Sequence, residues 1–202
     1  CDDISRGRLH LVLRDGTEPL GADGAPINVP FWRFTLDTNV ATRLAPDGSL
    51  WWTGMMEGSA GDPDPRLAVR AVRVNLEGEW SISEPLIPPG AEIANQTDDA
   101  VWAAVMPDGS YVTHVAGWRT AELHELRSSF IRVAPDGSVM WRWQPPGGLI
   151  AFGLAARDVA AAVSGDDVIA ILNPVIRDRR SLFLVRILPD GRSGGAISVF
   201  EQ

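Results

Sequence analysis

Two acids and a histidine stand close together in residues 118–125 and could supply acid–base chemistry. Glu122 and His124 follow Trp118, an aromatic side chain able to contact a ligand. On a helix, Glu122 and Glu125 would share a face while His124 would point elsewhere, so the spacing is not that of a metal-binding helix. A solvated loop explains the same stretch. We treat Glu122, His124 and Trp118 as candidate ligand-binding residues and leave the catalytic residues unknown.

A second stretch is rich in arginine. Arg177, Arg179 and Arg180 surround an aspartate. Guanidinium groups grip carboxylates and phosphates through paired hydrogen bonds, which makes these three residues candidates for binding an anionic ligand. The same side chains would pair with the aspartate in a solvated loop. Trp32, in another predicted connection, is a further candidate for ligand contact.

Cys1 is the only cysteine, so no disulfide forms within the chain. Three interpretations of this first residue stay open. It could carry a lipid anchor after removal of a bacterial lipoprotein signal peptide, it could be a nucleophile exposed by self-cleavage, or the sequence could start there without functional meaning. The lipoprotein interpretation predicts an extracytoplasmic location, in the periplasm or at the cell surface.

No metal site and no cofactor is predicted. Asp62 and Asp64 could bind calcium, but Asp-Pro-Asp-Pro is also a rigid turn without a third acid in register. Three scattered histidines make no ligand set. The net charge of −8 argues against a nucleic-acid partner, which needs a basic stripe. No apolar run reaches the roughly 20 residues of a transmembrane helix.

A repeated turn sequence predicts the secondary-structure elements that position these residues. Pro-Asp-Gly occurs with glycine at 48, 109, 137 and 191, and degenerate copies place glycine at 16, 78 and 165. Successive glycines are 26 to 32 residues apart, which identifies an internal repeat. Asp-Gly between apolar runs is typical of a β-hairpin, because glycine accepts the positive φ of the turn. The flanking runs are rich in β-branched and aromatic residues, as strands are.

Two kinds of hairpin alternate along the chain. Those around Gly48, Gly109 and Gly165 carry few charges, whereas the others carry arginine on their first strand. One buried and one more exposed hairpin make a four-stranded antiparallel sheet, so the predicted fold class is all-β. The chain then divides into a half unit and three full units, at residues 1–26, 27–88, 89–146 and 147–202. The strongest candidate for a helix is short, at Thr120–Leu126.

The repeat resembles the blades of bacterial β-propellers with Pro-Asp-Gly turns, of the PQQ-like and TolB-like kinds. The resemblance covers nearly the whole chain and implies blades but no particular activity. It implies about three and a half four-stranded blades, an incomplete ring that leaves an apolar blade face uncovered. A second chain, a homodimer mate or a further part of the same polypeptide would complete the ring.

In such a propeller the hairpin turns lie at one face and the longer connections at the other. Loops held by a rigid scaffold carry function, so the connection face is the predicted binding surface for a protein or small molecule. The predicted function is a non-enzymatic binding or scaffolding module. The alternatives are a hydrolase or lyase with its active site on that face, and a Cys1 nucleophile.

One arginine recurs five residues before a turn glycine, at positions 43, 73, 132 and 186. Because it repeats at equivalent places, it is predicted to belong to the scaffold. There it would cover an aromatic ring or pair with an acid between blades.

Overall fold

The computed structural model of the chain is built from β-strands. It describes residues 6–10, 28–32, 43–56, 68–88, 91–93, 102–120, 123–145, 159–172, 175–176 and 179–201. Every regular element in these ranges is a strand, which confirms the all-β prediction. None of the described residues belongs to a helix long and apolar enough to cross a lipid bilayer.

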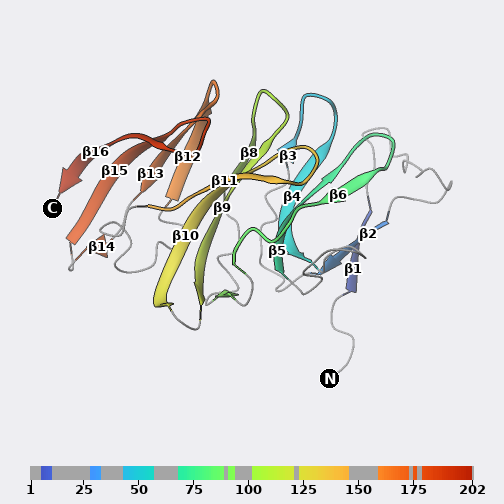
Figure 1. Cartoon of the computed structure of the whole chain (residues 1–202), viewed down its shortest axis with the longest axis horizontal. Coiled ribbons are helices and arrows are strands. Elements are labelled where there is room, and N and C mark those ends of the chain that lie inside the picture. The colour runs from blue at the N-terminus through green and yellow to red at the C-terminus, as the bar shows by residue number, and fades with distance from the viewer. Residues whose placement is uncertain are drawn as a thin grey trace.

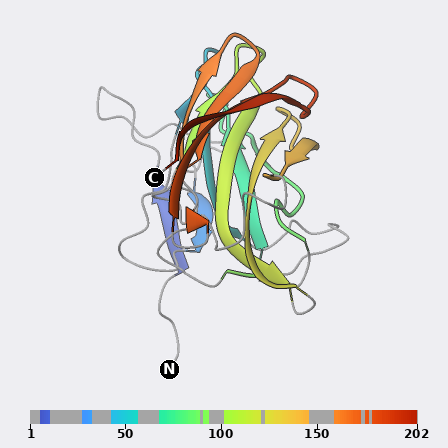
Figure 2. The same ribbon diagram turned by 90° about the vertical axis from the view of Figure 1, so that its left-hand side faces the viewer.

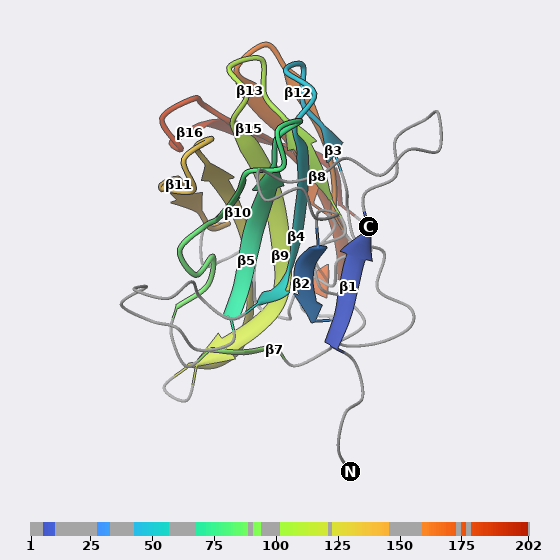
Figure 3. The ribbon, with the colours of Figure 1, turned by 90° about the vertical axis from the view of Figure 1, so that its right-hand side faces the viewer.

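Three antiparallel sheets lie side by side along the long axis of the molecule (Figure 1). The first contains β1 (Arg6–His10), β2 (Asn28–Trp32), β3 (Arg43–Leu44), β4 (Leu50–Met56), β5 (Ala68–Val74) and β6 (Trp80–Ile82). Its order is β1-β2-β4-β5-β6, and β3 also pairs with β4. The two strands from the start of the chain, β1 and β2, therefore extend this sheet (Figure 3).

The other two sheets have five strands each. The second contains β7 (Glu92–Ile93), β8 (Ala103–Val105), β9 (Tyr111–Thr120), β10 (Leu123–Val133) and β11 (Val139–Trp143). The third contains β12 (Val159–Ser164), β13 (Asp167–Leu172), β14 (Val175–Ile176), β15 (Arg179–Ile187) and β16 (Ser193–Glu201).

Each sheet contains one four-stranded meander built from one hairpin of each predicted kind. The meanders are β3-β4-β5-β6, β8-β9-β10-β11 and β12-β13-β15-β16. They are propeller-like blades, and the described sheets do not close a ring.

The predicted helix at Thr120–Leu126 is wrong. Thr120 ends β9, and Leu123, which begins β10, pairs with it across the antiparallel ladder. A helix of two turns has little stability of its own, so strand pairing on both sides decides the conformation here.

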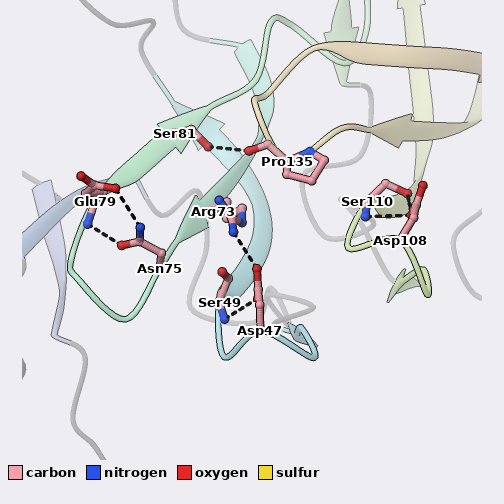
Figure 4. Close-up of polar contacts among 9 residues, drawn as sticks. All are labelled: Asp47, Ser49, Arg73, Asn75, Glu79, Ser81, Asp108, Ser110 and Pro135. Carbon is pink, nitrogen blue, oxygen red and sulfur yellow. Dashed lines mark hydrogen bonds and ion pairs between the residues drawn. The ribbon is translucent and has the colours of Figure 1, made fainter.

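The Pro-Asp-Gly hairpins share one turn geometry. In the first, the Gly48 amide donates to the Ala45 carbonyl at 2.9 Å, and the Ser49 amide donates to Asp47 Oδ1 at 2.9 Å. Gly48 has a φ of +84°, the left-handed conformation that the sequence predicts. The same bonds recur around the glycines at 109, 137 and 191. These aspartates therefore act as turn-formers, and Figure 4 shows two of them.

The hairpin turns lie toward one edge of the sheets, at the top of Figure 1, whereas β9 and β10 meet at the opposite edge. The predicted separation of turns from connections is thus observed in the second sheet. We call the lower edge in this view the connection end.

The hydrophobic cores lie between the sheets. Between the first and second, the Trp51 ring stacks on Tyr111 with centroids 5.2 Å apart and planes 3° from parallel. Between the second and third, Phe130 and Trp143 pack on Val185 and neighbouring apolar residues of the third sheet. Trp102 and Trp141 are partly buried and pack against this second core.

Two turn glycines with the same φ of +81° differ in the space around them. A Cβ on Gly191 would lie 2.7 Å from Cγ of Trp141 in the second sheet, whereas on Gly109 its nearest contact is Pro135 at 3.9 Å. We expect Gly109→Ala to lower the free energy of unfolding by about 1 kcal/mol through backbone strain, and Gly191→Ala by about 3 kcal/mol because it also separates two sheets. Urea unfolding measures both, and equal losses would contradict the packing of the third sheet on Trp141.

Candidate functional site

Arg132 on β10 makes three bonds with its guanidinium group. Nη2 donates to Asp108 Oδ2 at 2.9 Å, Nε donates to Ser110 Oγ at 2.7 Å, and Nη1 donates to the Pro189 carbonyl of the third sheet at 3.4 Å. Asp108 lies in the turn of the other hairpin of the same sheet. We call this link from a third-strand arginine to a turn carboxylate the arginine clamp.

The arginine clamp occurs once in each blade. Arg73 Nη2 donates to Asp47 Oδ2 at 2.8 Å (Figure 4), and Arg186 Nε donates to Asp167 Oδ2 at 2.7 Å. The prediction that these arginines pair with acids between blades is therefore wrong. The first turn of each blade lies beside its third strand, so the nearest carboxylate belongs to the same sheet.

The fourth repeated arginine behaves differently. Arg43 Nε donates to the Ala103 carbonyl at 2.7 Å and so links the first sheet to the second. The acceptor in this bond is a backbone group.

Hydrogen bonds and the clamp arginines favour the charged forms of Asp47 and Asp108. Burial acts to raise the pKa of Asp108, but hydrogen bonds from Ser110 and the charge of Arg132 outweigh it and hold this pKa below its usual value. The pKa of Asp47 is also lowered, first by the hydrogen bonds from Ser49 and then by Arg73. These carboxylates stay ionised as parts of the scaffold.

Carbonyls in the turns connect successive sheets. The Pro135 carbonyl of the second sheet accepts from Ser81 Oγ at 3.5 Å (Figure 4), and the Pro189 carbonyl of the third accepts from Trp141 Nε1 at 3.0 Å. The second and third blades thus each accept, at the same turn position, a hydrogen bond from the blade before them.

A histidine and a serine form a pair inside the second sheet. His114 Nε2 lies 3.0 Å from Ser128 Oγ, and both side chains are fully buried. Burial lowers the pKa of His114 to about 3, so the ring is neutral at physiological pH. Nδ1 has no hydrogen-bond partner among the described residues, so no carboxylate orients the ring there. A nucleophile must be reached by substrate, and this pair is sealed in the core, which gives it a structural role.

Trp118 is the one sequence-predicted site residue whose side chain the structure describes. It lies within β9 and not in a connection, is 2% exposed, and belongs to the core between the first and second sheets. Its indole Nε1 donates to Ser129 Oγ at 3.2 Å. In this conformation Trp118 packs the blade interface and does not face a ligand.

For the remaining candidate residues, the structure describes either the backbone alone or nothing. Cys1, Glu122 and Arg177 lie outside the described residues. Trp32 is in β2, His124 in β10, and Arg179 and Arg180 in β15, and their side chains lie outside the described part. The backbone of His124, among the first residues of β10, lies at the connection end, where β9 and β10 meet.

The structure gives residues to the uncovered apolar blade face that an incomplete ring implies. Ile171 and Ile197 of the third sheet are 40% and 64% exposed on a face that no described sheet covers. A signal was present, since residues 168–172 are apolar at every position and thus predict a strand with two apolar faces.

No group of three His, Cys, Asp or Glu side chains in the described ranges could hold a metal ion. The chain matches no known protein-family model and no curated protein sequence.

Proposed function

We propose that the chain is a non-enzymatic binding or scaffolding module of β-propeller blades that binds a protein or small molecule at the connection end. The observation that carries the proposal is that polar side chains described in the blades bind to one another and hold the blades together. The arginine clamps tie hairpins together within blades, and the His114–Ser128 pair is buried. A module of this kind has a rigid frame whose loops are left for recognition.

Arg177, Arg179 and Arg180 are the proposed contact for an anionic group, because guanidinium forks match carboxylate and phosphate geometry. The location proposed with it is extracytoplasmic, with Cys1 as the lipidated residue. Intact-mass spectrometry of the protein from its native host would show a diacylglyceryl adduct on Cys1, and an unmodified cysteine would contradict this location.

Binding is tested with inorganic phosphate and citrate as probes. We expect either anion to raise the Tm of the chain, and the triple variant Arg177→Ala, Arg179→Ala, Arg180→Ala to lose this shift while remaining folded. Arg192→Ala is the matched control, because Arg192 is an exposed arginine in a turn at the opposite edge. An equal shift in the triple variant would contradict the assigned surface. Turnover of any ester, amide or glycoside above that of a Glu122→Ala, His124→Ala variant would contradict a non-enzymatic function.

A further inference from the structure

The outer face of the third sheet carries a row of apolar side chains, one from each strand of its meander. The register pairs Ala160 with Ile171, Ile171 with Leu184, and Leu184 with Ile197. Along β13, Val168, Ala170 and Leu172 point into the core, so Ile171 points away from it. We call the surface of Ala160, Ile171, Leu184 and Ile197 the open face. The ribbon of the third sheet is turned toward the viewer in Figure 2.

The equivalent face of the second sheet is covered. Phe130 lies seven residues before Gly137, as Leu184 lies before Gly191, and Phe130 is fully buried against the third sheet. Trp143 lies six residues after Gly137, as Ile197 lies after Gly191, and Trp143 is 5% exposed. The open face therefore has the composition of a packed blade face without its cover.

The same face carries one described ion pair. Arg186 and Asp167 form the arginine clamp of the third blade, with side chains 56% and 15% exposed. In the second sheet the equivalent Arg132 also reaches the next sheet, through its bond to the Pro189 carbonyl. Arg186 thus occupies the position from which Arg132 contacts both the turn of its own sheet and the sheet that covers it.

The outer face of the first sheet, at the other end of the row of three sheets, has no similar exposed apolar surface among the described residues. On the first sheet, Trp52, Val72 and Val74 face away from the second sheet and are all buried. Of the two outermost sheet faces in the described part of the chain, the open face is the one that exposes apolar side chains, so the matching surface on a second copy is its own open face.

We propose that two copies of the chain pack open face to open face around a two-fold axis. Such a contact must be complementary to itself. Here the apolar row of one copy meets the row of the other, and Arg186 of each copy lies near Asp167 of its mate. The central strands β13 and β15 place Ile171 and Leu184 in the middle of the contact. The dimer does not involve the connection end, so it stands or falls independently of the proposed ligand site.

The test is the mass in solution of the full 202-residue chain under reducing conditions, which exclude a disulfide through Cys1. We expect sedimentation velocity and light scattering to show a concentration-dependent dimer. Ile171→Asp and Ile197→Asp should each weaken it by about tenfold or more, because a carboxylate would be buried in the contact. Leu44→Asp and Leu76→Asp are the matched controls, since both leucines are more than half exposed at turns of the first sheet and should leave the dimer intact.

A charge exchange keeps the test independent of whether the isoleucine variants fold. Arg186→Asp and Asp167→Arg should each be monomeric alone, because like charges would meet across the axis, and an equal mixture should restore the dimer. A wild-type chain that is monomeric at every concentration would overturn the proposal and leave a blade of another protein as the cover. A dimer that survives all the open-face variants would also overturn it.

Discussion

Replacing Arg132 with alanine is expected to lower the free energy of unfolding by about 3 kcal/mol. The Arg132 side chain is 4% exposed and donates to a carboxylate, a hydroxyl and a carbonyl in two sheets. Its removal breaks an ion pair whose arginine is buried and whose aspartate is half-exposed, and it takes one donor from the Pro189 carbonyl and one from Ser110 Oγ. The sum of these losses is about 3 kcal/mol.

The repeat supplies a matched control for this variant. Arg186 forms the same clamp in the third blade, but its side chain is half-exposed, so Arg186→Ala should cost less than about 1 kcal/mol. Urea unfolding of both variants, at concentrations low enough to keep the chain monomeric, gives the comparison. If the two losses are equal, burial between sheets contributes nothing to the clamp and the argument is wrong.

Replacing His114 with glutamine is expected to remove much of the acid sensitivity of the fold. The pKa of His114 falls from 6.5 in the unfolded chain to about 3 in the folded one because the ring is buried. Above pH 6.5 the ring is neutral in both states and has no effect on the pH dependence. Below it, only the unfolded chain takes up the proton, so stability falls by about 1.4 kcal/mol per pH unit.

Between pH 7 and pH 4.5 the wild type should therefore lose about 2.5 kcal/mol more than His114→Gln. The lower limit stays above the usual pKa of aspartate, 3.8, and the turn aspartates at 47, 108, 136 and 190 titrate lower still. Urea unfolding at four pH values measures the slopes. Ser128→Ala is the control, because it keeps the buried ring and should keep the wild-type slope. Identical slopes for wild type and His114→Gln would show that the folded chain protonates His114 freely.

Hairpin positions could be predicted because their causes are local. In each Pro-Asp-Gly turn the carboxylate bonds an amide two residues later, and glycine supplies the positive φ. These interactions lie within five residues, so the sequence around each glycine contains all the information. The all-β class and the four-stranded blades followed from counting such turns.

The candidate site was harder to predict, because the burial of its residues depends on how the strands pair. Trp118 was placed in a connection since glycine and charged residues surround it, yet β9 continues to Thr120. The long pairing of β9 with β10 extends the sheet and draws the indole into the core. Strand length was decided by that pairing, which no local pattern shows.

By itself, the amino-acid sequence determined the turns, the strands between them and the repeated position of arginine before the turn glycine. Only the tertiary structure decided which partner each repeated side chain has. Asp108 and Arg132 are 24 residues apart, and Trp143 reaches Ser193 across 50. The same arginine is buried in the second blade and exposed in the third, because a following sheet covers one and not the other. Identical local chemistry therefore yields a packed interior at one blade and an open apolar face at the next, since burial depends on the neighbouring sheet and not on the segment itself.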